Sequence, residues 1–279
     1  MNDVLSIIRN SLNQLKSAEK RVAESVLREP HQVIRYTIAE LADKADTSEP
    51  TVVRFCRKMG LQGYMDLRLS LARDLPSAQY IHEAVAEQDS PVQVMEKIFT
   101  CNQEALGNTL NKIDINVFDQ AVNILTHARR IEFYGSGGSG LVAKDAHHKF
   151  FRLGVPCIAY EDPHMQVMSA ALLASDCVVI AISATGSSKD IIDSIQVAKK
   201  SGAQTIGITG REKSPLGRIC DYHLSVYSKE TAIWLAPMST RIAQLALLDV
   251  LFVSIAMKKF NGARENLGKV KETLIDKRY

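Results

Sequence analysis

Residues 177–210 read CVVIAISATGSSKDIIDSIQVAKKSGAQTIGITG, and their pattern decides the fold of the C-terminal part of the chain. The apolar run at 177–182, mostly β-branched, is typical of a strand buried on both faces. A hydroxyl-rich turn follows, then apolar residues at helical spacing, a stop at Gly202 and a second apolar strand from Thr205. This β-loop-α-β order predicts an open parallel sheet, which binds ligands at the carboxyl ends of its strands.

The turn at 183–188 has the composition of an anion-binding site. Most of its residues carry a hydroxyl, and it leads into the N-terminus of a helix, whose free N–H groups attract anions. One hydroxyl would be enough to cap that helix, so capping alone explains the turn less well than a bound anion. A Walker lysine pattern is missing, so the sequence favours a small sugar phosphate over a nucleoside triphosphate. The predicted ligand-binding residues are Ser183, Thr185, Gly186 and Ser188, with the charge of Lys189 nearby.

A second loop, GSGGSG at 135–140, follows a short apolar strand at 131–134. It matches the G-x-G-x-x-G fingerprint of dinucleotide-binding proteins, and Glu161 lies about 20 residues further on, where that fingerprint places an acidic residue. The hydroxyl-rich turn has no role in a dinucleotide site, whereas both loops would serve if they converged on one phosphate. We therefore favour phosphate binding and keep the dinucleotide site as the alternative. The predicted phosphate-binding residues of this loop are Ser136, Gly137 and Ser139.

Residues 37–60 predict a helix-turn-helix. Thr37 and Glu40 form a capping box that begins one helix, and Ser48 begins another after a tight turn. The second helix has apolar residues on one face and basic residues on the other, and the segment 52–73 carries five basic residues and one acidic residue, a local charge of +4. A solvated face of an ordinary helical bundle is the alternative, but the capped turn between short helices favours DNA recognition. The predicted DNA-binding residues are Ser48, Thr51, Arg54, Arg57 and Lys58.

Length and composition argue against several other classes of protein. The 279 residues are 46% apolar, which is enough for a sizeable core in one or two domains, and the net charge is only +3. The cysteines are odd in number and lack C-x-x-C spacing, which argues against a disulfide framework or a zinc site and for a reducing compartment. The N-terminus has no signal-peptide pattern, and the apolar run at 242–257 is too short and too polar to span a bilayer. We expect a cytoplasmic protein with no metal, cofactor or membrane partner.

The stretch SEPTVVRFC at 48–56 resembles the S-x-P-T-V-x-R-F motif of the RpiR family of bacterial transcription regulators, and GLQGY at 60–64 resembles the next stretch of that family. Members join an N-terminal helix-turn-helix domain to a C-terminal sugar isomerase (SIS) domain that senses a phosphosugar. The resemblance implies an all-α DNA-binding domain followed by an α/β domain, a five-stranded parallel sheet with helices on both faces. The expected divisions are a DNA-binding domain at 1–77, a linker and lead-in helix at 78–112, and the SIS domain at 113–279.

The resemblance also implies roles for individual residues. It assigns phosphate binding to Ser139 and to the hydroxyls of the 183–188 turn, and it places Glu230 near the sugar. The chain is most similar to the HexR-like subgroup, whose effector is 2-keto-3-deoxy-6-phosphogluconate. However, Gly138 replaces a serine of that subgroup, and Ser187 stands where an arginine is expected. Hexose phosphates and amino sugar phosphates therefore stay open as effectors.

Together these patterns predict a DNA-binding transcriptional regulator of sugar catabolism. It would bind a double-stranded operator as a homodimer or a dimer of dimers and respond to a phosphosugar. One alternative is a phosphosugar isomerase or lyase, which needs a base beside the first carbons of the sugar. Glu230, His147 and His164 are the candidates for that base, and the sequence places none of them there, so we predict that the protein is not an enzyme. The other alternative is a regulator that senses a dinucleotide.

Overall fold

The computed structural model describes residues 3–74, 84–86, 88–228, 237–273 and 275. The chain divides into two compact units, Met1–Cys101 with Lys229–Met238 and Asn102–Ser228 with Ser239–Tyr279. The described part of the first unit is helical, whereas the second contains a parallel sheet. Each unit has an apolar core of its own.

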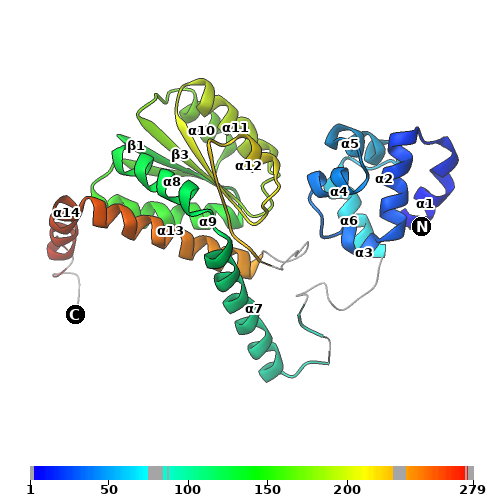
Figure 1. Ribbon diagram of the computed structural model, residues 1–279, viewed down its shortest axis with the longest axis horizontal. Helices are drawn as coiled ribbons and strands as arrows, with labels where there is room; N and C mark the ends of the chain where they lie inside the picture. Colours follow the sequence, from blue (N-terminus) through cyan, green and yellow to red (C-terminus); the bar gives the residue numbers. More distant parts are fainter. Residues whose placement is uncertain (1–2, 75–83, 87, 229–236, 274, 276–279) are drawn as a thin grey trace. The chain divides into compact units, whose positions relative to one another are not determined.

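Residues 3–74 of the first unit form a bundle of short helices around one core, drawn in blue and cyan in Figure 1. Val22, Leu41, Phe55 and Leu67 are fully buried there, one from each of four helices. The helix that contains Phe55 packs against three others, so it is held on several sides. The helices are α1 (Val4–Ser11), η1 (Leu12–Gln14), α2 (Ser17–Arg28), α3 (Pro30–Val33), α4 (Ile38–Lys44), α5 (Glu49–Lys58) and α6 (Tyr64–Asp74).

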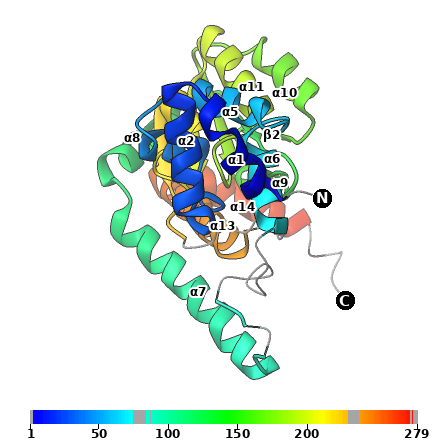
Figure 2. The ribbon, with the colours of Figure 1, turned by 90° about the vertical axis from the view of Figure 1, so that its right-hand side faces the viewer.

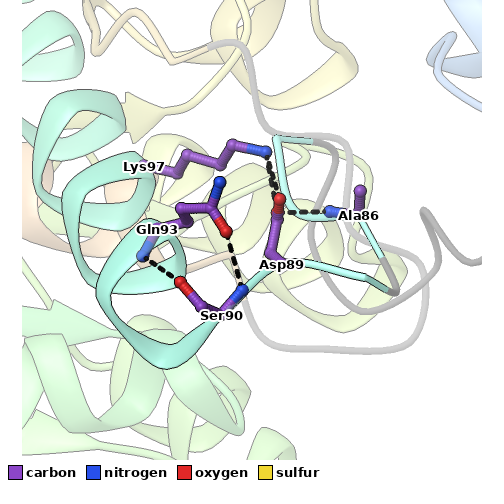
Figure 3. A network of polar contacts seen from close by, with 5 residues as sticks. All are labelled: Ala86, Asp89, Ser90, Gln93 and Lys97. Atoms are coloured by element: carbon purple, nitrogen blue, oxygen red, sulfur yellow. Dashed lines mark hydrogen bonds and ion pairs between the residues drawn. The ribbon is translucent and has the colours of Figure 1, made fainter.

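The long helix α7 (Pro91–Lys112) contains the boundary between the two units. Figure 3 shows how it begins: the Ser90 hydroxyl accepts a hydrogen bond from the Gln93 N–H at 3.4 Å, and the Gln93 side chain accepts one from the Ser90 N–H at 2.8 Å. Such a reciprocal pair satisfies two N–H groups that a helix start otherwise leaves free. Lys97 adds an ion pair to Asp89 at 2.7 Å. Helix α7 therefore begins at Pro91, with Ser90 as its cap.

The second unit is built on a five-stranded sheet in the order β2-β1-β3-β4-β5, with every neighbouring pair parallel. This confirms the predicted α/β fold. The central strand β3 is buried along its whole length, as its continuous apolar sequence requires. The strands are β1 (Arg130–Tyr134), β2 (Cys157–Tyr160), β3 (Cys177–Ser183), β4 (Gln204–Thr209) and β5 (Tyr222–Ser225).

Helices cover both faces of this sheet (Figures 1 and 2). On one face the helices α8, α9 and α13 pack against the apolar side chains of the strands, and on the other face the helices α10, α11 and α12 do so. A short turn η3 (Phe151–Leu153) and a final helix α14 (Phe260–Thr273) complete the unit. The covering helices are α8 (Ile115–His127), α9 (Gly138–Phe150), α10 (Pro163–Ala170), α11 (Lys189–Lys200), α12 (Pro215–Ile219) and α13 (Met238–Lys258).

Helix α13 extends beyond the apolar run at 242–257 and, contrary to the expectation from the sequence, is long and apolar enough by length and composition alone to cross a membrane. One of its sides, however, is part of the core beneath the sheet, with Leu247, Leu248 and Leu251 buried against the strands. Its opposite side leaves Val253 and Met257 exposed. This packing is that of a core helix that covers one face of a sheet.

Candidate functional site

The helix-turn-helix consists of α4, a turn and α5. The turn contains Asp46 with a φ of +46°, a conformation that aspartate tolerates better than most residues. Thr37 begins α4 as predicted, because its hydroxyl accepts the Glu40 N–H at 3.1 Å while the Glu40 carboxylate accepts the Thr37 N–H at 2.6 Å. Ser48 occupies the N-cap position of α5, but its hydroxyl lies 3.0 Å from the Thr51 hydroxyl instead of capping the backbone.

Helix α5 presents Arg54 and Arg57 to solvent, and Thr51 lies inside. Both arginine side chains are exposed, in agreement with a surface that can reach DNA. Thr51 is only 4% exposed, so the prediction that it shares their face is wrong. Because α5 packs against both α2 and α4, the buried arc of the helix is wider than its apolar stripe suggests. Thr51 instead accepts a hydrogen bond from the Arg54 guanidinium at 2.9 Å and thereby orients that side chain.

Lys58, at the end of α5, is bound to its own helical unit. Its ammonium donates to the Gln14 carbonyl at 2.9 Å and pairs with Glu19 at 3.2 Å. Burial raises the pKa of Glu19, but the hydrogen bonds from the Lys16 N–H and from Lys58 outweigh it, and the pKa lies below its usual value. Glu19 is therefore ionised at neutral pH and compensates the charge of Lys58.

The two loops predicted to bind phosphate leave neighbouring strands. Tyr134, the last residue of β1, is in register with Ala181 of β3, so both strands reach the same edge of the sheet. The order β2-β1-β3 also means that the chain turns in opposite directions after β1 and after β3. A crevice opens at such a switch point, outside the carboxyl ends of the strands, and this is where open sheets bind ligands. The structure thus brings the two loops together at the predicted edge.

The first loop is shaped by glycines. A side chain at Gly135 would place its Cβ 2.5 Å from the Ser139 carbonyl oxygen, and Gly137 has a φ of +56°. Ser136 is exposed and donates to the Glu161 carbonyl at 3.4 Å, whereas Ser139 is half-buried in the first turn of α9. The Ser139 hydroxyl therefore lies at a helix N-terminus, the end of a helix that favours anions.

Glu161 is already engaged by another residue. Its carboxylate forms an ion pair with Lys144, and a side chain at Gly140 would clash with it, its Cβ lying 2.7 Å from the Glu161 Oε1. A dinucleotide site would need this carboxylate for the ribose hydroxyls. The ion pair therefore counts against the dinucleotide alternative.

The second loop arranges its hydroxyls around Gly186. Ser183 is 3% exposed, and its hydroxyl accepts the Gly186 N–H at 3.0 Å and lies 3.2 Å from the Ser188 hydroxyl. Thr185 is exposed and accepts the Ser187 N–H at 3.2 Å. Ser188 occupies the N-cap position of α11 without a capping hydrogen bond from its side chain to the described residues. Simple capping therefore does not explain these hydroxyls.

The positive charge expected from Lys189 is compensated within its own helix. Its ammonium pairs with Asp193 one turn later, and this hydrogen bond raises the pKa of Lys189. Glu230, the remaining predicted ligand residue, lies outside the described residues. In the part of the chain that the structure describes, no group of histidine, cysteine and acidic side chains could hold a metal ion.

Sequence reasoning missed Gln166, which supports the first loop from below. This fully buried side chain donates from Nε2 to the Tyr160 carbonyl at 2.9 Å and to the Gly135 carbonyl at 3.3 Å. It joins the ends of β1 and β2 under the glycine loop. A single glutamine in a helix gives no signal in the sequence, because polar helical residues are usually exposed.

Comparisons with known proteins agree with the folds of the two units. Two family models match the chain, a helix-turn-helix domain of the rpiR family over residues 2–78 and a SIS domain over residues 124–254. The chain is 38% identical to the HTH-type transcriptional regulator HexR of Pseudomonas aeruginosa, over 100% of this chain and 98% of that protein. It is 35% identical to HexR of Escherichia coli, over 99% and 96%. The solved structure of the Vibrio vulnificus NanR protein complexed with ManNAc-6P superposes with a TM-score of 0.84, at 26% identity over 99% of both chains.

Proposed function

Because the chain belongs to the RpiR family of helix-turn-helix transcriptional regulators that carry a SIS domain, we propose that it reads operator DNA with α5 and senses a phosphosugar at the crevice between β1 and β3. One observation supports the effector site: two loops with hydroxyl side chains lie at the same switch point of the sheet, and each leads into the N-terminus of a helix. Such an arrangement offers neutral donors and helix dipoles to a phosphate.

The exposure and the contacts of each side chain support a proposed role. In the DNA-binding unit, at 1–77, Arg54 and Arg57 are the proposed base-reading residues, and Ser48, at the start of α5, is a proposed contact to a DNA phosphate. Thr51 and Lys58 support DNA binding indirectly. Thr51 is hydrogen-bonded to Arg54, and Lys58 is hydrogen-bonded to the Gln14 carbonyl. A linker and lead-in helix at 78–112 joins this unit to the SIS domain at 113–279, and the protein works in the cytoplasm.

The proposed ligand is a phosphorylated sugar or sugar acid. The Vibrio vulnificus relative was solved with ManNAc-6P, and the site here presents hydroxyls and backbone N–H groups that suit a phosphate. Thermal unfolding with ManNAc-6P, 2-keto-3-deoxy-6-phosphogluconate, glucose 6-phosphate and NAD tests the proposal. A ligand at 100 times its Kd stabilises the folded state by about 2.7 kcal/mol. Stabilisation by NAD alone would instead identify the glycine loop as a dinucleotide site.

We expect no turnover of sugar phosphates. An isomerase needs a base within hydrogen-bond reach of the sugar carbon, and His164 is exposed on α10 while His147 lies on the third turn of α9, beyond the loop. Incubation with glucose 6-phosphate, fructose 6-phosphate or ManNAc-6P should leave each compound unchanged by NMR. Turnover that disappears in Glu230→Gln, His164→Ala or His147→Ala would identify the protein as an enzyme.

We propose that the protein is at least a dimer, because two DNA-binding units are usually needed for tight operator binding. The exposed side of α13 offers an apolar surface, with Val250, Val253 and Met257 more than half exposed. Light scattering should give a dimer for the wild type and a smaller species for Val253→Glu, because a charge would be buried in the contact. The exposed Lys200→Glu variant serves as the control. A monomeric wild type at micromolar concentration would count against operator binding by two DNA-binding units.

A further inference from the structure

Helix α7 carries a row of apolar side chains that its own chain leaves exposed to solvent. These residues, which we call the α7 stripe, are Val92, Met95, Phe99, Leu106 and Leu110. They follow one another at intervals of three, four and seven positions, so they lie on one face of the helix, as the apolar positions of a coiled coil do. The residues of α7 that are buried in the described chain, Ala105 and Thr109, lie on a different side.

The exposure of the α7 stripe favours a partner that covers it. Figures 1 and 2 show α7 as one long continuous helix. Helices in proteins gain most of their stability from the packing of an apolar face, and contiguous exposed apolar surface marks interaction sites. Phe99 is 65% exposed and Leu110 is 78% exposed, so the chain itself covers little of either side chain. The stripe therefore lacks the packing that normally stabilises such a helix.

The residues of the stripe are arranged symmetrically about a point near the middle of α7. Phe99 and Leu106 lie equally far from this point along the sequence, and so do Met95 and Leu110. A two-fold interface has this symmetry, because residue i of one copy contacts residue j of the other, and j in turn contacts i. When two α7 helices lie antiparallel, Phe99 of each copy therefore meets Leu106 of the other, and Met95 meets Leu110.

Polar groups at the centre of the helix agree with this pairing. The symmetry point lies between Asn102 and Gln103, so these two amides face each other in an antiparallel pair. The Asn102 Oδ1 is buried and has no hydrogen-bond partner in the described chain, which is unfavourable. Turning this amide toward Gln103 of the second copy would satisfy it, and a polar pair within an apolar seam fixes the register of two helices. In this register uncharged residues lie opposite every charged residue of the helix, namely Glu96, Lys97, Glu104 and Lys112.

We propose that α7 of one copy packs antiparallel against α7 of a second copy along the α7 stripe, with the two-fold axis between residues 102 and 103. The inference rests on the proposed dimer and adds a contact that α13 does not supply. The occupant of the stripe is a second copy of this chain, because an identical helix offers a matching apolar residue or amide at each position and opposes no like charges.

Light scattering of the full chain tests the contact. Leu110→Glu should raise the dimer Kd about tenfold or more and give a smaller species, because the pairing would bury a charge. Since Leu110 is largely exposed, glutamate at this position removes little packing within one copy. Asn111→Glu, at the next exposed position and off the stripe, adds the same charge and should leave the mass unchanged. Thermal unfolding checks that each variant is folded.

Disulfide formation between copies tests the antiparallel register. Met95→Cys combined with Leu110→Cys, in a Cys101→Ser background, should give a covalent dimer on oxidation, with position 95 joined to position 110 by mass spectrometry. The two positions lie about 22 Å apart along one helix, too far for a disulfide within one copy. Each single cysteine variant should migrate as a monomer on a non-reducing gel, since an antiparallel pair keeps equivalent positions apart.

The outcomes separate this inference from the proposed dimer. If Leu110→Glu has the mass of the wild type while Val253→Glu dissociates, the α7 stripe is not a contact between copies, and the inference fails with the dimer intact. A lower unfolding temperature of Leu110→Glu at unchanged mass would show that the stripe is covered within its own chain, which also overturns the inference. A covalent dimer of a single cysteine variant would overturn the antiparallel pairing. A monomeric wild type would overturn the proposed dimer and the inference with it.

Discussion

Replacing both Arg54 and Arg57 with alanine is expected to remove specific DNA binding. The two side chains are exposed on α5, and Arg54 is oriented by its hydrogen bond to Thr51. An arginine that contacts a guanine edge contributes about 1–3 kcal/mol, so each single variant should lose about fivefold to a hundredfold in affinity. The two losses need not add, since the residues are one helical turn apart. Gel-shift titration against DNA selected from a random library by the wild type measures both effects at fixed salt.

The matched control for this experiment is Arg28→Ala. Arg28 is an exposed arginine of α2 in the same helical unit, and it forms a surface ion pair with Glu29. Exposed ion pairs contribute little to stability, so this variant should bind DNA like the wild type. The slope of affinity against salt separates base contacts from phosphate contacts, because losing a phosphate contact lowers that slope by about one. If the double variant binds DNA as tightly as the wild type, α5 is not the helix that contacts the bases.

The sequence predicts the parts of the molecule that local patterns encode. Thr37 caps its helix as predicted, the strand predicted at 177–182 is buried, and the two loops with their glycines lie where the sequence places them. These features depend on neighbouring residues and on backbone conformation, so a single sequence carries them. The two loops lie side by side because β1 and β3 are neighbours in the parallel sheet. This strand order comes from the structure.

The errors and omissions come from contacts between distant residues. The sequence places Thr51 on the exposed side of α5, because the apolar stripe of the helix indicates only one buried side. In the structure α2 and α4 both cover this helix, and Thr51 is buried. The sequence predicts that the charge of Lys58 is available to DNA, but an ion pair with Glu19, which is distant in the sequence, compensates it. Gln166 gives no signal, because a polar residue becomes a support for a loop only when the fold buries it against specific carbonyls.

Gly186→Ala is expected to abolish the response to phosphosugar while DNA binding persists. Gly186 has a φ of +64°, which costs an alanine about 1–2 kcal/mol, and the new Cβ would also lie 2.5 Å from the Ser214 hydroxyl. The loop must then rearrange, and with it the Ser183 and Ser188 hydroxyls that surround Gly186.

Two further variants separate this local effect from a general loss of stability. Gly107→Ala makes the same change in α7, where an added Cβ would meet no atom within 4 Å, and it should bind ligand normally. Ser183→Ala keeps the backbone and removes one donor, so it should weaken phosphosugar binding by about 1.5–3 kcal/mol, the value of a hydrogen bond to a charged group. Calorimetry with ManNAc-6P and gel shifts with and without it report the two activities separately. If Gly186→Ala and Ser183→Ala both bind the probe like the wild type, the second loop does not hold the phosphate, and the site must be sought elsewhere on the sheet.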